Sequence, residues 1–259
     1  MTTPRPDPGP PPEGGDAARE MRRMTRRSFA AGGLAALGGF GTWKWLQSRP
    51  VADGLPGPFR AGHELNERVG RALFSDRHLA PEFDRSLAGD LRVNGWHGWS
   101  DDIPAAADWA IEVEAPGRPP RRVGLGELAA LPRVESVFEF KCIEGWSRVV
   151  AWGGYRFGDF LTAFDLIPPD PALQYLLLST PDGGYTAALD LPSATHPQSL
   201  LCDAMNGAPL TPGHGAPVRL VLPVKYGVKN IKWLSKVQFR AARPTDYWTA
   251  RGYDWYAGL

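Results

Sequence analysis

One cysteine stands where the pattern of a strand changes to that of a turn. The stretch from Phe138 to Ser147 alternates apolar and charged residues, then enters a Gly-containing corner at Cys142. Lys141 precedes this cysteine and Arg148 follows it by six residues. A thiol beside cations has its thiolate favoured, which suits a metal ligand or a nucleophile, with these two cations as candidates for tuning its charge. Burial as ordinary core remains an equal alternative.

A metal site built from protein ligands alone is not indicated. The chain has no CxxC or HxxxH spacing, and its five histidines are scattered: His63, His78, His97, His196 and His214. A metal at Cys142 would therefore need further ligands from a non-protein group. We interpret Cys202 as core, although a disulfide with Cys142 stays open. His63, His78 and His196 are expected at the surface.

A second cluster concentrates positive charge around one apolar strand. Such donors, converging from a strand and the Gly-containing turn after it, suit a phosphate; a solvated sheet edge guarded by lysines is the alternative. Aromatic and aliphatic residues interleave with the cations, which favours some inward-pointing side chains. The cluster comprises His214, Arg219, Lys225, Lys229 and Lys232. The sequence contains no G-x-S-x-G nucleophile elbow, no Walker phosphate-binding loop and no G-x-G-x-x-G dinucleotide-binding unit. The commonest hydrolase and nucleotide-binding classes are therefore not indicated.

The elements that must position these residues predict a mixed α+β fold. The chain has 259 residues with 26 Pro and 30 Gly, which favours a loop-rich protein containing strands. Residues 91–99 read as a strand entering a turn. The other predicted strands are 109–114, 134–140, 174–180, 185–189 and 218–224, and residues 234–239 are expected to close the domain. The predicted helices are 64–74, 123–131, 156–166 and 199–205.

The N-terminal part has the composition of a targeting segment. Residues 1–20 are rich in proline and predicted to be disordered, and residues 21–52 carry Arg26-Arg27 before an uncharged, Gly-rich stretch from Ser28 to Trp43. The sequence around these arginines resembles a twin-arginine export signal, which predicts a periplasmic protein. No small-x-small cleavage site follows, so the segment could remain as an anchor; an amphipathic anchor or a short buried helix is the alternative.

The remaining chain divides into residues 53–240, predicted as the catalytic domain, and residues 241–259, an aromatic tail expected to dock on that domain or on a partner. The formal net charge of +1 offers no electrostatic footprint for nucleic acid.

The order of the motifs is similar to one known family. Cys142-Ile143-Glu144-Gly145-Trp146-Ser147 resembles the molybdenum-ligating turn of the sulfite oxidase family of molybdopterin enzymes, and residues 205–233 resemble its cofactor-binding segment. The resemblance covers roughly residues 90–240. It implies a sulfite-oxidase-type α+β domain with several sheets and short helices, in which the Cys142 thiolate binds molybdenum beside the pterin dithiolene.

The resemblance also implies the other site residues. Tyr185 matches an active-site tyrosine of sulfite oxidases, and Arg148 is a loose match to their anion-binding arginine. The implied pterin contacts are Asn94, His97, Thr180, His214, Arg219, Asn230, Ile231 and Lys232.

Smaller bacterial members of this family include periplasmic methionine-sulfoxide reductase subunits. The resemblance therefore implies an oxidoreductase that transfers an oxygen atom to or from a small, sulfur-containing substrate, with sulfoxide reduction slightly favoured over sulfite oxidation. It implies a molybdenum-molybdopterin cofactor, no haem in this chain, and a membrane cytochrome or another electron-transfer partner. Two alternatives are a non-enzymatic periplasmic module that binds a partner through its aromatic tail, and a thiol hydrolase that pairs Cys142 with His97 or His214.

Overall fold

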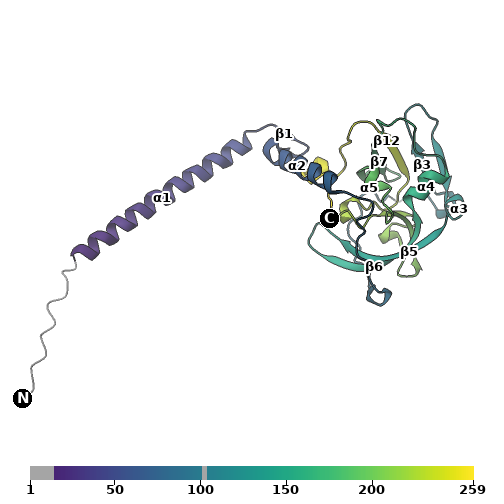
Figure 1. Cartoon of the computed structure of the whole chain (residues 1–259), viewed down its shortest axis with the longest axis horizontal. Helices are drawn as coiled ribbons and strands as arrows, with labels where there is room; N and C mark the ends of the chain where they lie inside the picture. The colour runs from purple at the N-terminus through teal and green to yellow at the C-terminus, as the bar shows by residue number, and fades with distance from the viewer. Residues whose placement is uncertain (1–14, 101–103) are drawn as a thin grey trace, which may run out of the picture. The chain divides into compact units, whose positions relative to one another are not determined.

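The computed structural model describes residues 15–100 and 104–259, which fall into two units (Figure 1). The first unit, up to Pro50, contains helix α1 (Gly15–Gln47). The first 14 residues of the tail predicted to be disordered lie outside the described residues, whereas Gly15 to Glu20 are helical. Within the described residues, no helix combines the length and apolar character needed to cross a membrane.

The second unit, Val51–Leu259, is built on two five-stranded sheets. The first sheet has the order β10 (Ala208–Pro209), β9 (Leu200–Met205), β6 (Ser147–Arg156) and β5 (Arg133–Lys141), and β11 (Arg219–Val221) also pairs with β9. The second has the order β4 (Arg121–Gly124), β3 (Ala110–Glu114), β12 (Lys236–Arg240), β7 (Tyr175–Ser179) and β8 (Thr186–Asp190). The β12–β3 pair is parallel, and the other pairs are antiparallel.

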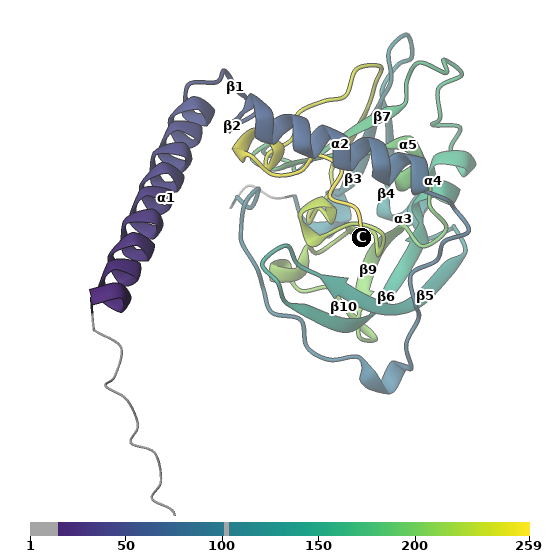
Figure 2. The same cartoon turned by 60° about the vertical axis from the view of Figure 1, so that its left-hand side comes forward.

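Short helices and turns connect these strands. A two-stranded hairpin of β1 (Val51–Ala52) and β2 (Leu55–Pro56) leads into α2 (Gly57–Leu73), which Figure 2 shows on the outside of the unit. The other helices are α3 (Leu125–Leu128), α4 (Phe157–Ala163) and α5 (Leu191–Ala194), with 3-10 turns η1 (Arg85–Leu87), η2 (Ala106–Asp108), η3 (Pro212–His214), η4 (Gly227–Lys229) and η5 (Thr249–Arg251). The predicted α+β fold is confirmed.

The main hydrophobic core joins α4 to the second sheet and to the strand region around β11. Phe157 and Phe160 of α4, Leu176 and Leu178 of β7, and Trp233 are fully or almost fully buried in it. A second core forms on β5, β6 and β9 around Phe138, Trp152 and Cys202. Burial of this many large side chains gives the loops between the strands a rigid support.

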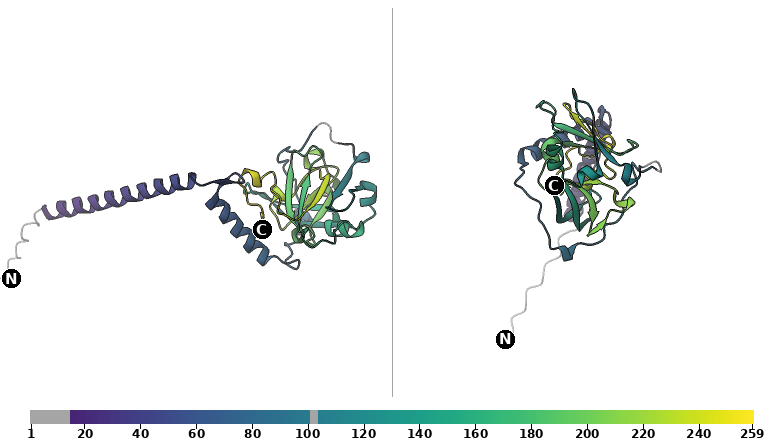
Figure 3. Two further views of the ribbon diagram at one scale, coloured as in Figure 1. Left: turned by 90° about the horizontal axis from the view of Figure 1, so that it is seen from above. Right: turned by 90° about the vertical axis from the view of Figure 1, so that its right-hand side faces the viewer.

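The C-terminal segment packs into the second unit. Trp255 and Tyr256 are buried beside Tyr175 and Ala188 of the second sheet. The amide of Tyr226 donates to the carbonyl of Ala257 at 3.0 Å, so the segment also holds the chain around η4. Figure 3 shows the C-terminus on the same unit, near α2.

Several local predictions are wrong. Residues 199–205 form strand β9 instead of a helix, because their backbone pairs with β6 and β11 at the centre of the first sheet. The pairing of tertiary neighbours outweighs intrinsic propensity in so short a segment. Residues 91–99 form loop and turn, not a strand, and the predicted strand 218–224 is regular at 219–221 alone.

His196 is another correction. It is 1% exposed rather than at the surface, with its ring 5.9 Å from that of Phe74 and its Nδ1 accepting from the Gln198 amide. Both cysteines are free and buried, so the open disulfide is not formed, and Cys202 belongs to the core on a strand.

Candidate active site

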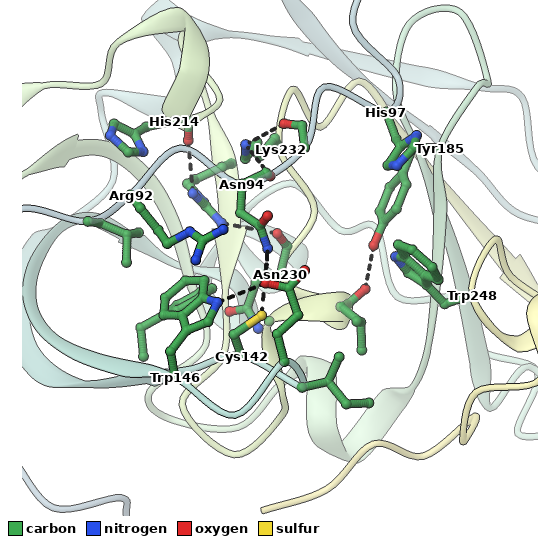
Figure 4. Close-up of a pocket in the computed structure, with 18 of the residues that line it drawn as sticks. Arg92, Asn94, His97, Cys142, Trp146, Tyr185, His214, Asn230, Lys232 and Trp248 are labelled. Carbon is green, nitrogen blue, oxygen red and sulfur yellow. Dashed lines mark hydrogen bonds between the residues drawn. The ribbon is translucent and has the colours of Figure 1, made fainter.

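Cys142 occupies a tight turn between β5 and β6. The amide of Cys142 donates to the carbonyl of Trp146 at 2.9 Å, and the amide of Gly145 donates to the carbonyl of Cys142 at 3.1 Å. Gly145 has φ +87°, a conformation in which a side chain would be strained. These constraints fix the Cys142 side chain, which is 8% exposed and lines a cavity of about 190 Å³ (Figure 4).

The thiol is surrounded by one amide, one carboxylate and one guanidinium. Asn94 Nδ2 lies 3.7 Å from Cys142 Sγ and 3.3 Å from Glu144 Oε2. The Trp146 indole also donates to this carboxylate, at 2.9 Å, and the Arg92 guanidinium lies 5.4 Å from the Trp146 ring centroid. Burial raises the pKa of the Cys142 thiol, the Glu144 charge adds to that rise, and Asn94 and Arg92 oppose it.

The cations beside Cys142 in sequence are not its neighbours in the cavity. Lys141 Nζ lies 3.6 Å from Glu139 Oε2, and the Arg148 guanidinium packs against Gly89. Neither side chain lines the cavity, whereas Arg92 does. Successive residues of a strand point to opposite faces, so sequence adjacency is a poor guide to contact here. The prediction that Lys141 and Arg148 tune the thiol is wrong; Arg92 is the adjacent cation.

Another wall of the cavity is cationic. Arg219 on β11 is 2% exposed and donates from Nη1 to the carbonyl of His214 at 3.0 Å and from Nη2 to that of Asn230 at 3.1 Å. Its Nε is buried and has no hydrogen-bond partner among the described residues. Burial lowers the pKa of Arg219 to about 10. An unpaired buried N–H is costly, so this atom marks a place for an acceptor.

Lys232 and His214 add to this wall. Lys232 Nζ donates to the carbonyls of Asn94 and Gly95, both at 3.0 Å. Burial, with the charge of Arg219 as a second cause, lowers the pKa of Lys232 to about 7 and also lowers that of His214. Gly215 has φ +102°, and a Cβ there would meet the Lys232 and Arg219 side chains within about 3 Å, so the turn after His214 needs glycine.

Two lysines of the predicted phosphate cluster turn away from the cavity. Lys229 Nζ lies 2.5 Å from Asp246 Oδ2, and both side chains are 2% exposed. Lys225 Nζ lies 2.9 Å from the Tyr256 ring centroid, and burial lowers the pKa of this lysine to about 7. Both contacts tie the loop around η4 to the C-terminal segment. These two cations therefore hold the wall in place instead of forming its surface.

The third wall combines Tyr185 with the C-terminal segment. Tyr185 Oη donates to the carbonyl of Val228 at 2.7 Å, and burial raises the pKa of this phenol. His97 Nδ1 lies 3.2 Å from Tyr247 Oη, and Trp248 and Tyr253 line the cavity with ring centroids 4.9 Å apart. Figure 4 shows Tyr185, His97 and Trp248 together on one side, facing the Cys142 turn.

Most of the predicted site residues meet at this cavity. Its lining includes Asn94, His97, Cys142, Tyr185, His214, Arg219, Asn230 and Lys232. Asn230 also braces its loop, since its Oδ1 accepts from the Leu222 amide and its Nδ2 donates to the Tyr226 carbonyl.

Two predicted contacts are not among the lining residues. Ile231 is fully buried in the main core. Thr180 is 2% exposed; its Oγ1 donates to Asp182 and accepts from the Tyr185 amide, which makes it a support for the Tyr185 turn.

Sequence reasoning left several lining residues without a role, among them Glu144, Trp146, Trp248, Tyr253 and Arg92. Glu144 and Trp146 belong to the Cys142 turn, whose alternation of inward and outward side chains could have indicated them. Trp248 and Tyr253 come from the tail, where the density of aromatics was the available signal. Arg92 lies in the segment 91–99 that was predicted as a strand entering a turn, and no pattern in that segment indicated a role for it.

The donor set fits a molybdopterin better than the alternatives. Within the described part of the chain, no group of three or more His, Cys, Asp and Glu side chains could hold a metal, so a metal at Cys142 needs ligands from another molecule. The wall of Arg219, Lys232 and His214, with its unpaired Arg219 Nε, suits the phosphate of such a molecule. The hydrogen bond to the Cys142 thiol comes from Asn94, not from a histidine, which disfavours a thiol hydrolase.

Comparison with known proteins supports the same assignment. Residues 97–248 match the family model described as "Oxidoreductase molybdopterin binding domain". The chain is 31% identical over 240 residues to the "Putative protein-methionine-sulfoxide reductase subunit YedZ1" of Azospira oryzae, covering 92% of this chain and 87% of that protein. It is 32% identical over 171 residues to the "Protein-methionine-sulfoxide reductase catalytic subunit MsrP" of Campylobacter jejuni, covering 59% of this chain and 57% of that one.

Among solved structures, the sulfane dehydrogenase SoxCD of Paracoccus pantotrophus matches over 54% of this chain and 40% of its own, with 16% identity and a TM-score of 0.49. The family model covers more than half of the chain, and the relative from Azospira oryzae covers nearly all of it. The chain is therefore a molybdopterin-binding oxidoreductase, a member of the family to which the sulfite oxidases belong.

Proposed function

We propose that this oxidoreductase reduces sulfoxides, with methionine sulfoxide as the substrate class. The observation that carries the proposal is the distribution of charged side chains around one cavity. Cys142 and Glu144 line one part of the cavity, and the buried Arg219 and the half-buried Lys232 line another part with positive charge. Such a cavity offers a thiol for the metal of the cofactor and cations for its phosphate within one site.

The residues present would divide the cofactor between them. Cys142 Sγ would bind molybdenum, and the Arg219 Nε–H, together with Lys232 and His214, would hold the pterin phosphate. When bound, the group supplies two-electron oxygen-atom transfer. The protein contributes a fixed thiol, a phosphate site that excludes bulk water, and the aromatic walls that orient the substrate.

The Glu144 carboxylate offsets the positive charge of Arg92 beside Cys142, so this part of the cavity gives no net attraction for an anionic substrate. Glu144 lines the cavity two residues from the thiol, and a carboxylate there repels the sulfite dianion more than it repels an uncharged sulfoxide. Arg148, a candidate to bind an anionic substrate, packs against Gly89 instead. Trp146, Trp248 and Tyr253 offer apolar surface to the methyl and methylene groups of a sulfoxide side chain. The two relatives named as methionine-sulfoxide reductase subunits support this direction.

The reaction requires an electron donor and protons. A sulfoxide accepts two electrons and two protons and yields a sulfide and water. Both relatives are named as subunits, which implies a partner subunit, and we propose a membrane cytochrome as the donor. The Thr25-Arg26-Arg27-Ser28-Phe29 sequence supports export by the twin-arginine route and a periplasmic location, with residues 21–52 as signal or anchor.

The test is a comparison of substrates with chemically reduced dye as the electron source. Protein folded in a molybdenum-replete cell is expected to contain molybdenum and pterin and to oxidise the dye with methionine sulfoxide, while showing far slower sulfite oxidation with an acceptor dye. Glu144→Gln is the matched variant, because it keeps the size of the side chain; sulfite turnover should rise relative to sulfoxide turnover. Faster sulfite oxidation by the unmodified protein contradicts the proposed direction. An intact fold without molybdenum would instead indicate a non-enzymatic module.

A further inference from the structure

Helix α2 presents its apolar side to solvent. Leu65, Val69 and Leu73 follow one another at intervals of four residues, so they form a stripe about 12 Å long on one face of the helix. Their side chains are 54%, 49% and 69% exposed. The opposite face carries Arg60 and Glu67, which are 4% and 8% exposed. The amphipathic pattern of this helix is thus the reverse of the one expected for a surface helix of a soluble domain.

Specific contacts lock the helix in this orientation. Arg60 donates to four backbone carbonyls, those of Ala52, Asp53, Thr249 and Tyr253. Because these acceptors come from the hairpin before the helix and from the C-terminal segment, rotation of α2 would leave a buried guanidinium without partners.

The second half of the helix is fixed in the same way. Glu67 pairs with Arg71 at 3.3 Å and with Arg243. Gly70 lies against the Tyr256 ring, where a Cβ would clash, so the helix approaches the domain closely at that point. The outward position of the apolar stripe is therefore fixed by the buried contacts on the other face of the helix.

The surroundings of the stripe suit a lipid surface. Ala61, Gly62 and Ala72 are exposed and widen the apolar face without adding polar groups. Glu64, at its edge, lies 3.9 Å from Arg243, whereas Arg68 has no ion pair among the described residues. The uncompensated charge at the edge is therefore positive, which complements anionic lipid headgroups.

The chain before α2 has the same character. Nine residues separate the end of helix α1 from α2, and the uncharged stretch of α1 exposes Phe29, Leu34 and Phe40 by 83%, 72% and 61%. Four arginines precede that stretch within residues 22–27. Each of these two helices thus exposes apolar side chains and carries arginine nearby in sequence. An exposed apolar helix face of this kind can insert into lipid without a matching protein groove.

We propose that α2 is a membrane-surface contact of this enzyme, with Leu65, Val69 and Leu73 inserted at the headgroup boundary of an anionic bilayer. The helix would hold one face of the catalytic unit against the membrane, in addition to any anchoring by residues 21–52. The inference goes beyond the proposed sulfoxide reduction and does not depend on which substrate the site reduces.

The test places a nitroxide label on Val69→Cys in the full-length, cofactor-loaded protein. Cys142 and Cys202 are buried, so the introduced cysteine is the accessible one among these three. On vesicles of phosphatidylethanolamine and phosphatidylglycerol, the label should gain accessibility to oxygen and lose accessibility to a water-soluble nickel chelate. Leu87→Cys, on η1 and 60% exposed, is the matched site and should keep its accessibility to both.

Paired variants separate the stripe from a general loss of structure. Leu65→Ser/Val69→Ser/Leu73→Ser should reduce vesicle binding and keep cofactor content and dye-linked turnover, because these side chains point away from the domain. Leu87→Ser/Ile167→Ser, which also removes exposed apolar side chains, should bind vesicles like the parent. The proposal is overturned if the label at Val69 stays accessible to nickel on vesicles that carry the protein. It is equally overturned if protection requires a second protein, or if the triple variant binds vesicles as the parent does.

Discussion

The two ends of the cavity are built differently. At the cationic end, Arg219 is 2% exposed, stacks over Trp152 at 5.0 Å and donates to two carbonyls, and Asn230 behind it makes further loop contacts. At the other end, the Cys142 turn projects from two strand ends, with Ile143 36% exposed and Glu144 exposed. Since buried, multiply bonded groups move little, the cationic end is suited to hold the cofactor phosphate, whereas the more exposed thiol end leaves access for a substrate beside the metal that Cys142 would bind.

Cys142→Ser tests the thiol end and should have the largest effect on activity. A serine hydroxyl is a poor ligand for molybdenum in place of a thiolate, so dye-linked sulfoxide reduction should fall to background. The cationic end is untouched, and pterin should therefore remain bound. Pterin and molybdenum analysis beside the turnover assay checks both statements. Retention of full turnover would remove Cys142 from the chemistry; Cys202→Ser, at the other buried cysteine, is the control.

Arg219→Met tests the cationic end, and the expected loss is of cofactor. Methionine keeps much of the volume beside Phe140 and Trp152 but removes every donor, so the protein should fold and retain little pterin. Arg219→Lys should retain an intermediate amount, because a point charge cannot replace the guanidinium N–H donors. Pterin fluorescence after denaturation measures the occupancy. Equal occupancy in all three proteins would show that this wall does not hold the cofactor.

The Asp246→Asn variant tests whether the C-terminal segment stabilises the cationic wall. It leaves Lys229 as a buried charge without its carboxylate, which costs about 3–5 kcal/mol of unfolding free energy. Asp246 also accepts from the amides of Ala188 and Thr249, so the segment should loosen around the cavity. Urea unfolding of the purified variants measures the change. Lys229→Met/Asp246→Asn, which removes both charges, should recover part of the loss; no recovery would argue against the ion pair as the cause.

The smallest effect concerns pH and the apoprotein. Burial lowers the pKa of Lys232 to about 7 from 10.5, so between these values the unfolded chain binds a proton that the folded chain does not. Stability should therefore rise with pH across this window, by at most about 1.4 kcal/mol per pH unit for this lysine. Lys232→Met should show a shallower rise, with the part due to Lys225 remaining. Thermal unfolding at several pH values measures this rise in the parent and in Lys232→Met. Parallel profiles of stability against pH for the two proteins would contradict the lowered pKa of Lys232.

The predictability of the fold differed between segments for physical reasons. Strand 109–114 and strand 134–140 were recognised because alternation of apolar side chains is a local signal that pairing reinforces. Residues 199–205 were misassigned, since their strand conformation depends on partners in β6 and β11 that lie far away in sequence. Residues 91–99 carry strand-like side chains, yet they cross the cavity as a loop in which Lys232 binds the carbonyls of Asn94 and Gly95.

The sequence by itself determined the identity of the chemistry: the residue types at Cys142, His214, Arg219 and Lys232, their order, and the lack of a protein-only metal motif. Tertiary structure decided which side chains share the cavity. It replaced Arg148 with Arg92, withdrew Lys225 and Lys229 into contacts with the C-terminal segment, and added Trp248 and Tyr253. The reason is that residue type is local, whereas the direction of a side chain follows from strand pairing and burial across distant segments.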